Sequence, residues 1–460
     1  MRDLLVFGIV LLTLPASFRR PFLGLLVFSW LAYMRPQDLC WGFARNMRLS
    51  FFVAIAMIVG WWANERGRRA FATWDFRSGA MVLLGVLVTT SYMFAKTHDD
   101  YTNTYFVEYV KIIVIALFTS GQIDSRARMR AMLWLIALSL AFFGVKGGIF
   151  GLLSGGARIL RGPGGMLEDN NDFALGLVMN VPLLWYLGLN EGLRANRPMI
   201  VRGTRIAVAL TIVTIVLTQS RGAFLALCMV GLWIAWRSGR LLRAFAVLAS
   251  LAVIFPFVAP QEVLERLQTI GDSKEASVNA RYTAWGVAFE MIEDNPVWGV
   301  GLRNFQSRYL DYAEVIPGRG TTTYVAHNSY LQIWAESGSL AFLVYLAMIG
   351  SVFFACRRVW HMGRSRPDLA WMSDYARMME ATTIGFMFGA FFLNRGHFDL
   401  IYHWLSIVTA LSAIGYVAYH RAPETAAGTA GPRSIRVRWR GAPIASHARA
   451  LSWQRPGGWR

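Results

Sequence analysis

The 460-residue sequence is 55% hydrophobic and only 16% charged, which leaves too few charged residues to cover a soluble protein of this length. Its formal net charge of +19 would suit a nucleic-acid-binding protein. However, the arginines gather in short loops that alternate along the chain, as expected of loops facing anionic lipid. The composition therefore predicts an integral membrane protein without a nucleic-acid partner.

Apolar segments follow one another along the whole chain. They cover residues 3–18, 21–34, 49–64, 78–95, 106–121, 130–153, 172–189, 204–219, 222–237, 243–259, 329–355, 378–394 and 399–419. All are expected to be helical, because backbone exposed to lipid has no water to satisfy its hydrogen bonds. The first two are short and suit one broken element. The sequence thus predicts an all-α polytopic membrane protein with 12 transmembrane helices, or 13 if both count.

Arginine-rich loops predict the orientation of these helices. Arginines cluster in the loops at 65–77, 124–130, 190–205, 237–243 and 356–377, which are therefore expected in the cytoplasm. The intervening loops, including 35–48, 154–171 and 394–399, are expected on the periplasmic side. The chain divides into transmembrane helices with short loops (1–259), a large helical periplasmic loop (260–328), C-terminal transmembrane helices (329–420) and a disordered basic cytoplasmic tail (421–460).

Two arginine-containing helix starts offer candidate anion sites. Arg221 lies in the turn Thr-Gln-Ser-Arg-Gly at 218–222, beside the start of a helix. A guanidinium group matches phosphate bidentately, and helix N-termini add N–H donors, so this turn suits an oxyanion. The alternative is an arginine that snorkels to the membrane interface.

The large loop contains a second such helix. Four of its residues recur at spacings of three to four and define one face, Arg281, Trp285, Phe289 and Ile292. This face would lie on the bilayer with an arginine at its start, and an ordinary interfacial helix is the alternative. The helix is expected to end at Asn295, before a glycine turn at 299–301 that permits close backbone approach.

A histidine precedes the next apolar segment. His327 and Asn328 lie in the sequence Ala-His-Asn-Ser-Tyr-Leu at 326–331. A histidine at the lip of a membrane cavity can accept a proton from a sugar hydroxyl near neutral pH. The alternative is an interfacial histidine that caps a helix.

The loop at 154–172 carries two arginines on the predicted periplasmic side. Arg158 and Arg161 depart from the arginine bias of the other loops and therefore need a partner. An anionic substrate would supply one, and Glu168 or Asp169 within the same loop is the alternative.

Three motifs, taken in order around the large loop, resemble the O-antigen ligase family, which also contains O-antigen polymerases and protein O-oligosaccharyltransferases. They are SRGAFLAL at 220–227, NARYTAWGVAFEMIEDNPVWGVGLRNF at 279–305 and AHNSYLQIWAESGSLAFL at 326–343. The N-terminal YMRPQDLCWGFARN at 33–46 is similar to the branch of O-glycosylation ligases associated with exosortase systems. The family is similar in architecture to other lipid-linked-sugar glycosyltransferases.

The resemblance implies a glycosyltransferase of the bacterial inner membrane that works on the periplasmic face without a metal or other cofactor. It would transfer a glycan from undecaprenyl pyrophosphate, with inversion, to a hydroxyl of lipid A-core oligosaccharide and so complete lipopolysaccharide. Carried over by position, Arg221 and Arg281 would bind the pyrophosphate and His327 would be catalytic. Arg158, Arg161, Trp285 and Asn328 are candidates for further donor or acceptor contacts.

Two alternatives stay open. An O-antigen polymerase or protein O-oligosaccharyltransferase would use the same donor with another acceptor. A transporter of lipid-linked sugar would use the arginines only to hold the headgroup. Relatives commonly have a Pro-Asn pair where this chain has Asp169-Asn170-Asn171, so the resemblance assigns no role to that loop.

Overall fold

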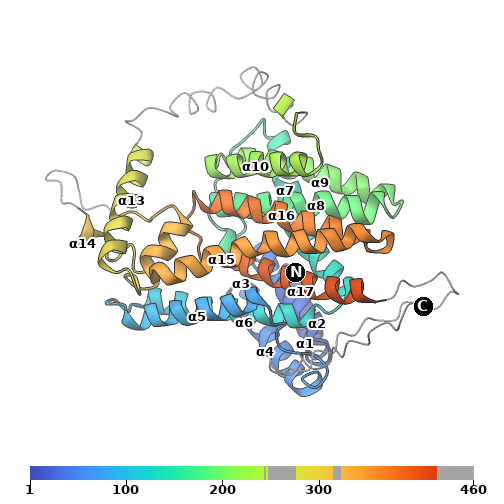
Figure 1. The fold of residues 1–460 in the computed structure, drawn as a ribbon, viewed down its shortest axis with the longest axis horizontal. Coiled ribbons are helices and arrows are strands. Elements are labelled where there is room, and N and C mark those ends of the chain that lie inside the picture. Colours follow the sequence, from blue (N-terminus) through green and yellow to red (C-terminus); the bar gives the residue numbers. More distant parts are fainter. Residues whose placement is uncertain (243–244, 247–275, 314–322, 422–460) are drawn as a thin grey trace, which may run out of the picture.

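The computed structural model describes residues 1–242, 245–246, 276–313 and 323–421 (Figure 1). The expected segment at 243–259 and the expected basic tail fall almost wholly outside these residues. Within the described part every regular element is helical, and the one β-type contact is an isolated bridge between Arg161 and Asp169. The all-α prediction is therefore confirmed for this part of the chain.

Each predicted apolar segment other than 243–259 lies wholly or mostly on a described helix. The described α-helices are α1 (Arg2–Arg19), α2 (Pro21–Tyr33), α3 (Phe43–Asn46), α4 (Leu49–Asn64), α5 (Phe76–Phe94), α6 (Asp100–Gln122), α7 (Arg126–Leu153), α8 (Asn170–Leu187), α9 (Pro198–Leu217), α10 (Arg221–Arg237), α13 (Ala276–Asp294), α14 (Tyr309–Tyr312), α15 (Ser329–Ser365), α16 (Ala370–Ala390) and α17 (Asp399–His420). Of these, α3, α13 and α14 lie outside the predicted segments. The long helices α5, α15, α16 and α17 run side by side across the molecule (Figure 1).

The number of spans differs from the prediction. Among the described residues, 7 helices are long and apolar enough to cross a membrane: α5, α6, α7, α8 with its extension to Leu193, α9, α15 and α17. Two further apolar helices, α2 and α4, have only 13 and 16 residues. The expected count of 12 or 13 is therefore not confirmed, because apolar composition predicts a helix more surely than it predicts a crossing.

Arginine-rich loops gather at one end of the helices, which we call the basic end. Arg69 between α4 and α5 pairs with Asp124 between α6 and α7, with 2.8 Å from Nε to Oδ2. Arg194, after α8, pairs with Asp374 in α16 at 2.6 Å. Segments far apart in sequence thus meet at this end through arginine–carboxylate pairs. This agrees with the prediction that the arginine-rich loops lie on the same side.

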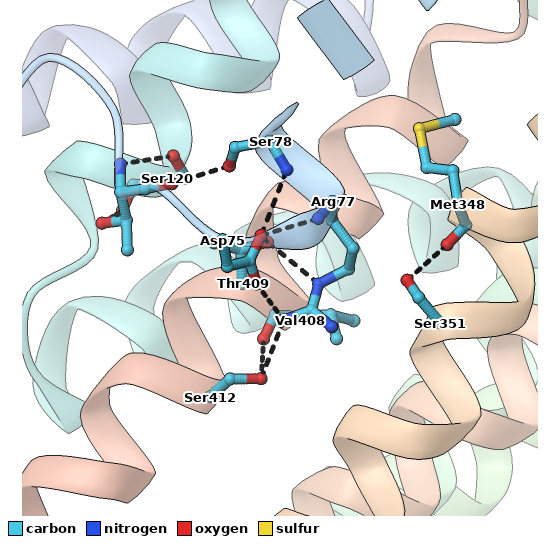
Figure 2. Close-up of polar contacts among 10 residues, drawn as sticks. Asp75, Arg77, Ser78, Ser120, Met348, Ser351, Val408, Thr409 and Ser412 are labelled. Carbon is cyan, nitrogen blue, oxygen red and sulfur yellow. Dashed lines mark hydrogen bonds and ion pairs between the residues drawn. The ribbon is translucent and has the colours of Figure 1, made fainter. Parts of the chain in front are cut away.

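Arg77 was expected to belong to an arginine-rich loop but is buried inside the bundle. Figure 2 shows it beside Asp75, which pairs with its guanidinium and also caps α5 by accepting from the backbone of Ser78 at 3.1 Å. The Arg77 Nε atom donates to Thr409 of α17 at 3.0 Å, and Nη2 donates to Ser412 at 3.0 Å. Because a buried cation needs such partners, this cluster joins α5 to α17.

The remaining loops meet at the opposite end, which we call the site end. The Asn304 side chain donates to the Thr97 carbonyl at 3.2 Å, which links the loop after α13 to the loop before α6. The Asn170 side chain donates to the Thr218 carbonyl at 3.0 Å and links the start of α8 to the end of α9. Helices α13 and α14 lie at this end, at the left of Figure 1.

Helix α13 packs on the first turns of α15 through one face. Its buried residues are Ala284, Val287, Ala288, Met291 and Ile292, which form a core with Val300, Phe305, Tyr309, Ala326 and Ala335. Of the face predicted to lie on the bilayer, only Ile292 belongs to this core, and Phe289 is 48% exposed. The three-to-four spacing predicted the helix, and the contact of its other face with the bilayer stays a prediction.

The glycine turn after α13 fits against a kink in α15, as its composition predicted. Gly338 has φ 83°, a left-handed value that interrupts the helix. The backbone N–H of Val300 donates to the Ala335 carbonyl at 2.8 Å, and that of Ser339 donates to the Pro296 carbonyl at 2.9 Å. Backbone therefore packs directly on backbone, which leaves no room for a side chain at this point.

We predict that Gly338→Ala destabilises the protein. A Cβ atom at Gly338 would lie 2.0 Å from the Val297 carbonyl oxygen, and its positive φ disfavours any other residue. The expected cost is about 2 kcal/mol or more, measured as a lower apparent Tm in detergent. Gly350→Ala on the same helix is the matched control, because nothing lies within 4 Å of its added Cβ. Equal Tm values for the two variants would contradict the packing described.

Candidate functional site

The turn between α16 and α17, residues 391–398, organises the site end. The ring of Phe391 lies edge-on to that of Trp285 in α13, with 5.8 Å between centroids. Phe392 lies against the start of α10, where a Cβ at Gly222 would be 2.7 Å from the Phe392 Cβ. The turn therefore holds α13, which carries Arg281, and the start of α10, which carries Arg221.

The same turn holds the segment before α15. The Ser329 hydroxyl donates to the Leu393 carbonyl at 2.8 Å and accepts from the Arg395 backbone N–H at 2.8 Å. The Tyr330 hydroxyl donates to the Met387 carbonyl near the end of α16 at 2.9 Å. His327 stands two residues before Ser329, so its position follows from these contacts.

His327 is itself fixed in an unusual backbone conformation. Its φ of 46° lies in the left-handed region, which non-glycine residues seldom adopt. On one side, Asn328 caps α15 by accepting from the N–H groups of Tyr330 and Leu331 at 2.9 and 3.2 Å. On the other, Trp285 Nε1 donates to the Ala326 carbonyl at 2.9 Å. Asn328 and Trp285, expected as substrate contacts, thus hold the histidine segment in place.

Charges on both sides of His327 act on its imidazole. Partial burial lowers the pKa of His327, the positive charge of Arg281 lowers it further, and the negative charge of Asp169 opposes the shift. The charges of Arg281 in α13 and of Asp169 at the start of α8 therefore both reach the histidine. The imidazole is accordingly neutral at pH 7 and able to accept a proton.

Arg221 begins α10, as the sequence predicted. The Ser220 side chain caps this helix by accepting from the Ala223 N–H at 3.4 Å. The Phe392 contact at Gly222 fixes this helix start against the turn that also touches α13. Arg281, by contrast, was expected at the start of its helix but lies in the second turn of α13, which begins at Ala276. The helices that carry the two arginines nevertheless contact the same turn.

The loop at 154–169 brings its acidic end to the site. Its backbone is tied down by the Ile159 N–H, which donates to the Leu217 carbonyl at 3.0 Å, and by the bridge between Arg161 and Asp169. Asp169 caps α8 by accepting from the Asn171 N–H at 2.8 Å. Arg158 and Arg161 are both exposed, so the structure places Asp169 beside His327 and these two arginines on the loop surface.

Several polar residues of this end were not predicted as site residues from the sequence. Arg395 forms an ion pair with Asp172 of α8, which is 4% exposed. Burial and the positive charge of Arg303 lower the pKa of His397 to about 3. The polar run Asn-Arg-Gly-His-Phe-Asp at 394–399, set between two apolar segments, was the signal that could have revealed this group.

Comparison with protein families adds an independent observation. Residues 206–346 match the family described as O-antigen ligase, and residues 1–188 match a family of unknown function. A search of curated proteins found no match. The ligase match includes Arg221, Arg281 and His327, the residues whose segments meet at the turn between α16 and α17. The match over residues 206–346 supports membership of the O-antigen ligase family and, with it, a membrane enzyme that transfers glycosyl groups.

Proposed function

We propose that the protein is an O-antigen ligase that transfers a glycan from undecaprenyl pyrophosphate to a hydroxyl of lipid A-core oligosaccharide. The observation that carries this proposal is that the segments bearing Arg221, Arg281 and His327 all contact the turn between α16 and α17, which brings two cations and a base to one end of the bundle. A lipid-linked diphosphate needs cationic partners, and an acceptor hydroxyl needs a base.

Arg221 and Arg281 are proposed to bind the donor diphosphate. A polyprenyl diphosphate is already a good leaving group, so the enzyme has mainly to position it and stabilise the negative charge that develops as the glycosidic bond breaks. Guanidinium groups suit this task because they stay charged and bind phosphate oxygens bidentately. The start of α10 adds backbone N–H donors beside Arg221.

His327 is proposed to be the general base. Its imidazole takes the proton of the acceptor hydroxyl as the acceptor oxygen bonds to the anomeric carbon, and the diphosphate leaves with the electron pair of the broken bond. Asp169 stabilises the imidazolium that forms, because its negative charge faces the ring. Direct displacement inverts the anomeric carbon, so an α-linked donor gives a β-linked product.

The distribution of arginines supports the proposed orientation. The basic end carries the clustered loop arginines, a bias typical of the cytoplasmic side. The site end would then face the periplasm of the inner membrane.

We predict that His327→Ala lowers glycan transfer by about 10²–10⁴-fold, because the base is lost. Arg281→Ala and Arg221→Ala should each lower it by about 10²–10³-fold, because charge stabilisation is lost. The measurement is transfer from labelled lipid-linked glycan by purified protein in detergent, with lipid A-core, a glycan chain and a peptide offered in parallel as acceptors. His361→Ala and Arg205→Ala, both exposed and outside the site end, are the matched controls.

Two results of this assay would count against the proposal. Full transfer by His327→Ala would remove the histidine from the mechanism. Labelling of the glycan chain or the peptide in place of lipid A-core would identify a polymerase or a protein-glycosylating enzyme.

The pH dependence offers a separate check on the role of His327. Transfer should rise with pH as the imidazole loses its proton, with an apparent pKa below the ordinary histidine value of 6.5. Asp169→Asn removes the charge that raises this pKa, so the acid limb of kcat/KM should move to lower pH. Asparagine also caps helices well, which preserves the start of α8.

The control for this profile is Glu168→Gln, which removes an exposed neighbouring carboxylate whose charge is not among those acting on His327. Its profile should match that of the wild type. A shift of the Asp169→Asn limb to higher pH would show that another group sets the observed pKa.

A further inference from the structure

Arg303 occupies a backbone conformation that only glycine adopts without strain. It lies in the loop between α13 and α14 at the site end, with φ 58°. Holding a non-glycine residue in this region costs free energy and persists where the surroundings determine it. Glycine would suit this backbone conformation better, so the arginine at position 303 must be explained by what its side chain does.

Buried Glu336 interacts with Arg303 through the backbone and through charge. Glu336 is 1% exposed, and its carboxylate interacts with the backbone N–H groups of Arg303 and Phe305. The Gln332 side chain donates to the same carboxylate at 3.2 Å. The positive charge of Arg303 also acts on this carboxylate, whose hydrogen bonds are supplied by main-chain and amide donors.

The guanidinium lies on an aromatic ring. The Arg303 Cζ atom is 4.1 Å from the ring centroid of Tyr105 in α6. Its Nε atom is buried without a hydrogen-bond partner, and no carboxylate of the described residues forms an ion pair with it. Arg395, by contrast, pairs with Asp172 at the same end. The charge of Arg303 acts on the carboxylates of Glu336 and Asp172 without forming an ion pair among the described residues, so an anionic ligand would stabilise this partly buried cation further.

A second tyrosine extends the aromatic surface into solvent. The rings of Tyr101 and Tyr105 are 4.6 Å apart, on the first turns of α6, and Tyr101 is 51% exposed. The face of an aromatic ring is electron-rich and packs well against the C–H face of a pyranose. A guanidinium beside it can bind a carboxylate or phosphate group of the same sugar.

Arg303 and Arg281 belong to the same polar end but act on different residues of it. The charges acting on His327 are those of Arg281 and Asp169. Arg303 instead acts on Asp172 and His397. Because the proposed function assigns Arg281 to the donor diphosphate, Arg303 is available to the acceptor.

We propose that Arg303, Tyr101 and Tyr105 form an acceptor subsite that binds a sugar carrying a carboxylate or phosphate group. This inference rests on the proposed function for its assignment to the acceptor. The binding site itself does not depend on that assignment, because it consists of an aromatic surface and a cation that forms no ion pair within the described part of the chain.

Arg303→Gly tests the subsite without straining the fold, because glycine adopts the positive φ freely. We expect the KM for an acidic lipid A-core acceptor to rise by about tenfold or more, which corresponds to about 1.4 kcal/mol. The KM for the lipid-linked donor should stay unchanged, and the preference for acidic over neutral acceptors should disappear. Tyr105→Leu removes the ring on which Arg303 lies and should also weaken acceptor binding.

Direct binding separates this inference from the proposed transfer reaction. Purified protein is titrated with trigalacturonate, with phosphorylated maltotriose and with neutral maltotriose, in the absence of donor. We expect wild-type protein to bind at least one acidic trisaccharide more tightly than maltotriose, and Arg303→Gly to lose that difference. If this binding is seen while no acceptor is glycosylated, the subsite stands and the proposed function fails.

Three results would overturn the subsite. Equal binding of acidic and neutral trisaccharides by wild-type protein would show that Arg303 does not recognise an anionic sugar. A higher KM for the donor alone would place Arg303 with the diphosphate. Unchanged KM values for both substrates in Arg303→Gly would make the residue structural.

Discussion

The site end depends on one hydroxyl group. Ser329 donates to the Leu393 carbonyl and accepts from the Arg395 N–H, both at 2.8 Å, and so joins the start of α15 to the turn between α16 and α17. The same turn touches α13 through Phe391 and α10 through Phe392. Because buried polar backbone must find partners, this turn cannot move without breaking several contacts. It thereby fixes the segments that carry Arg221, Arg281 and His327 relative to one another.

The two ends of the bundle use arginine differently. At the basic end Arg69 and Arg194 have carboxylate partners, and buried Arg77 is held by Asp75 and two hydroxyls of α17. These pairs connect helices and leave the cations satisfied. At the site end Arg303 has an aromatic ring in place of a carboxylate. Paired arginines of the first kind hold the fold together, whereas an unpaired one beside a polar site suits a ligand.

Much of the site was predictable because its residues occupy local motifs. The start of α10 at Arg221, the end of α13 before Asn295 and the start of α15 after His327 all followed from apolar runs and helix signals. The number of spans was not predictable, since α2 and α4 are apolar but short. The sequence also gave no indication of which face of α13 packs against the protein, because that face is decided by contacts with α15 and the loop that follows α13.

The sequence by itself determined that the chain is helical, that its apolar segments alternate with arginine-rich loops, and which three residues suit phosphate binding and base chemistry. Only the tertiary structure decided what stands beside them. That Asp169 and Arg281 face His327, and that Arg395 pairs with Asp172, involves residues separated by tens to hundreds of positions. Hydropathy is a local property that sets each helix, whereas these pairings arise from how the helices pack and which buried charges must be satisfied.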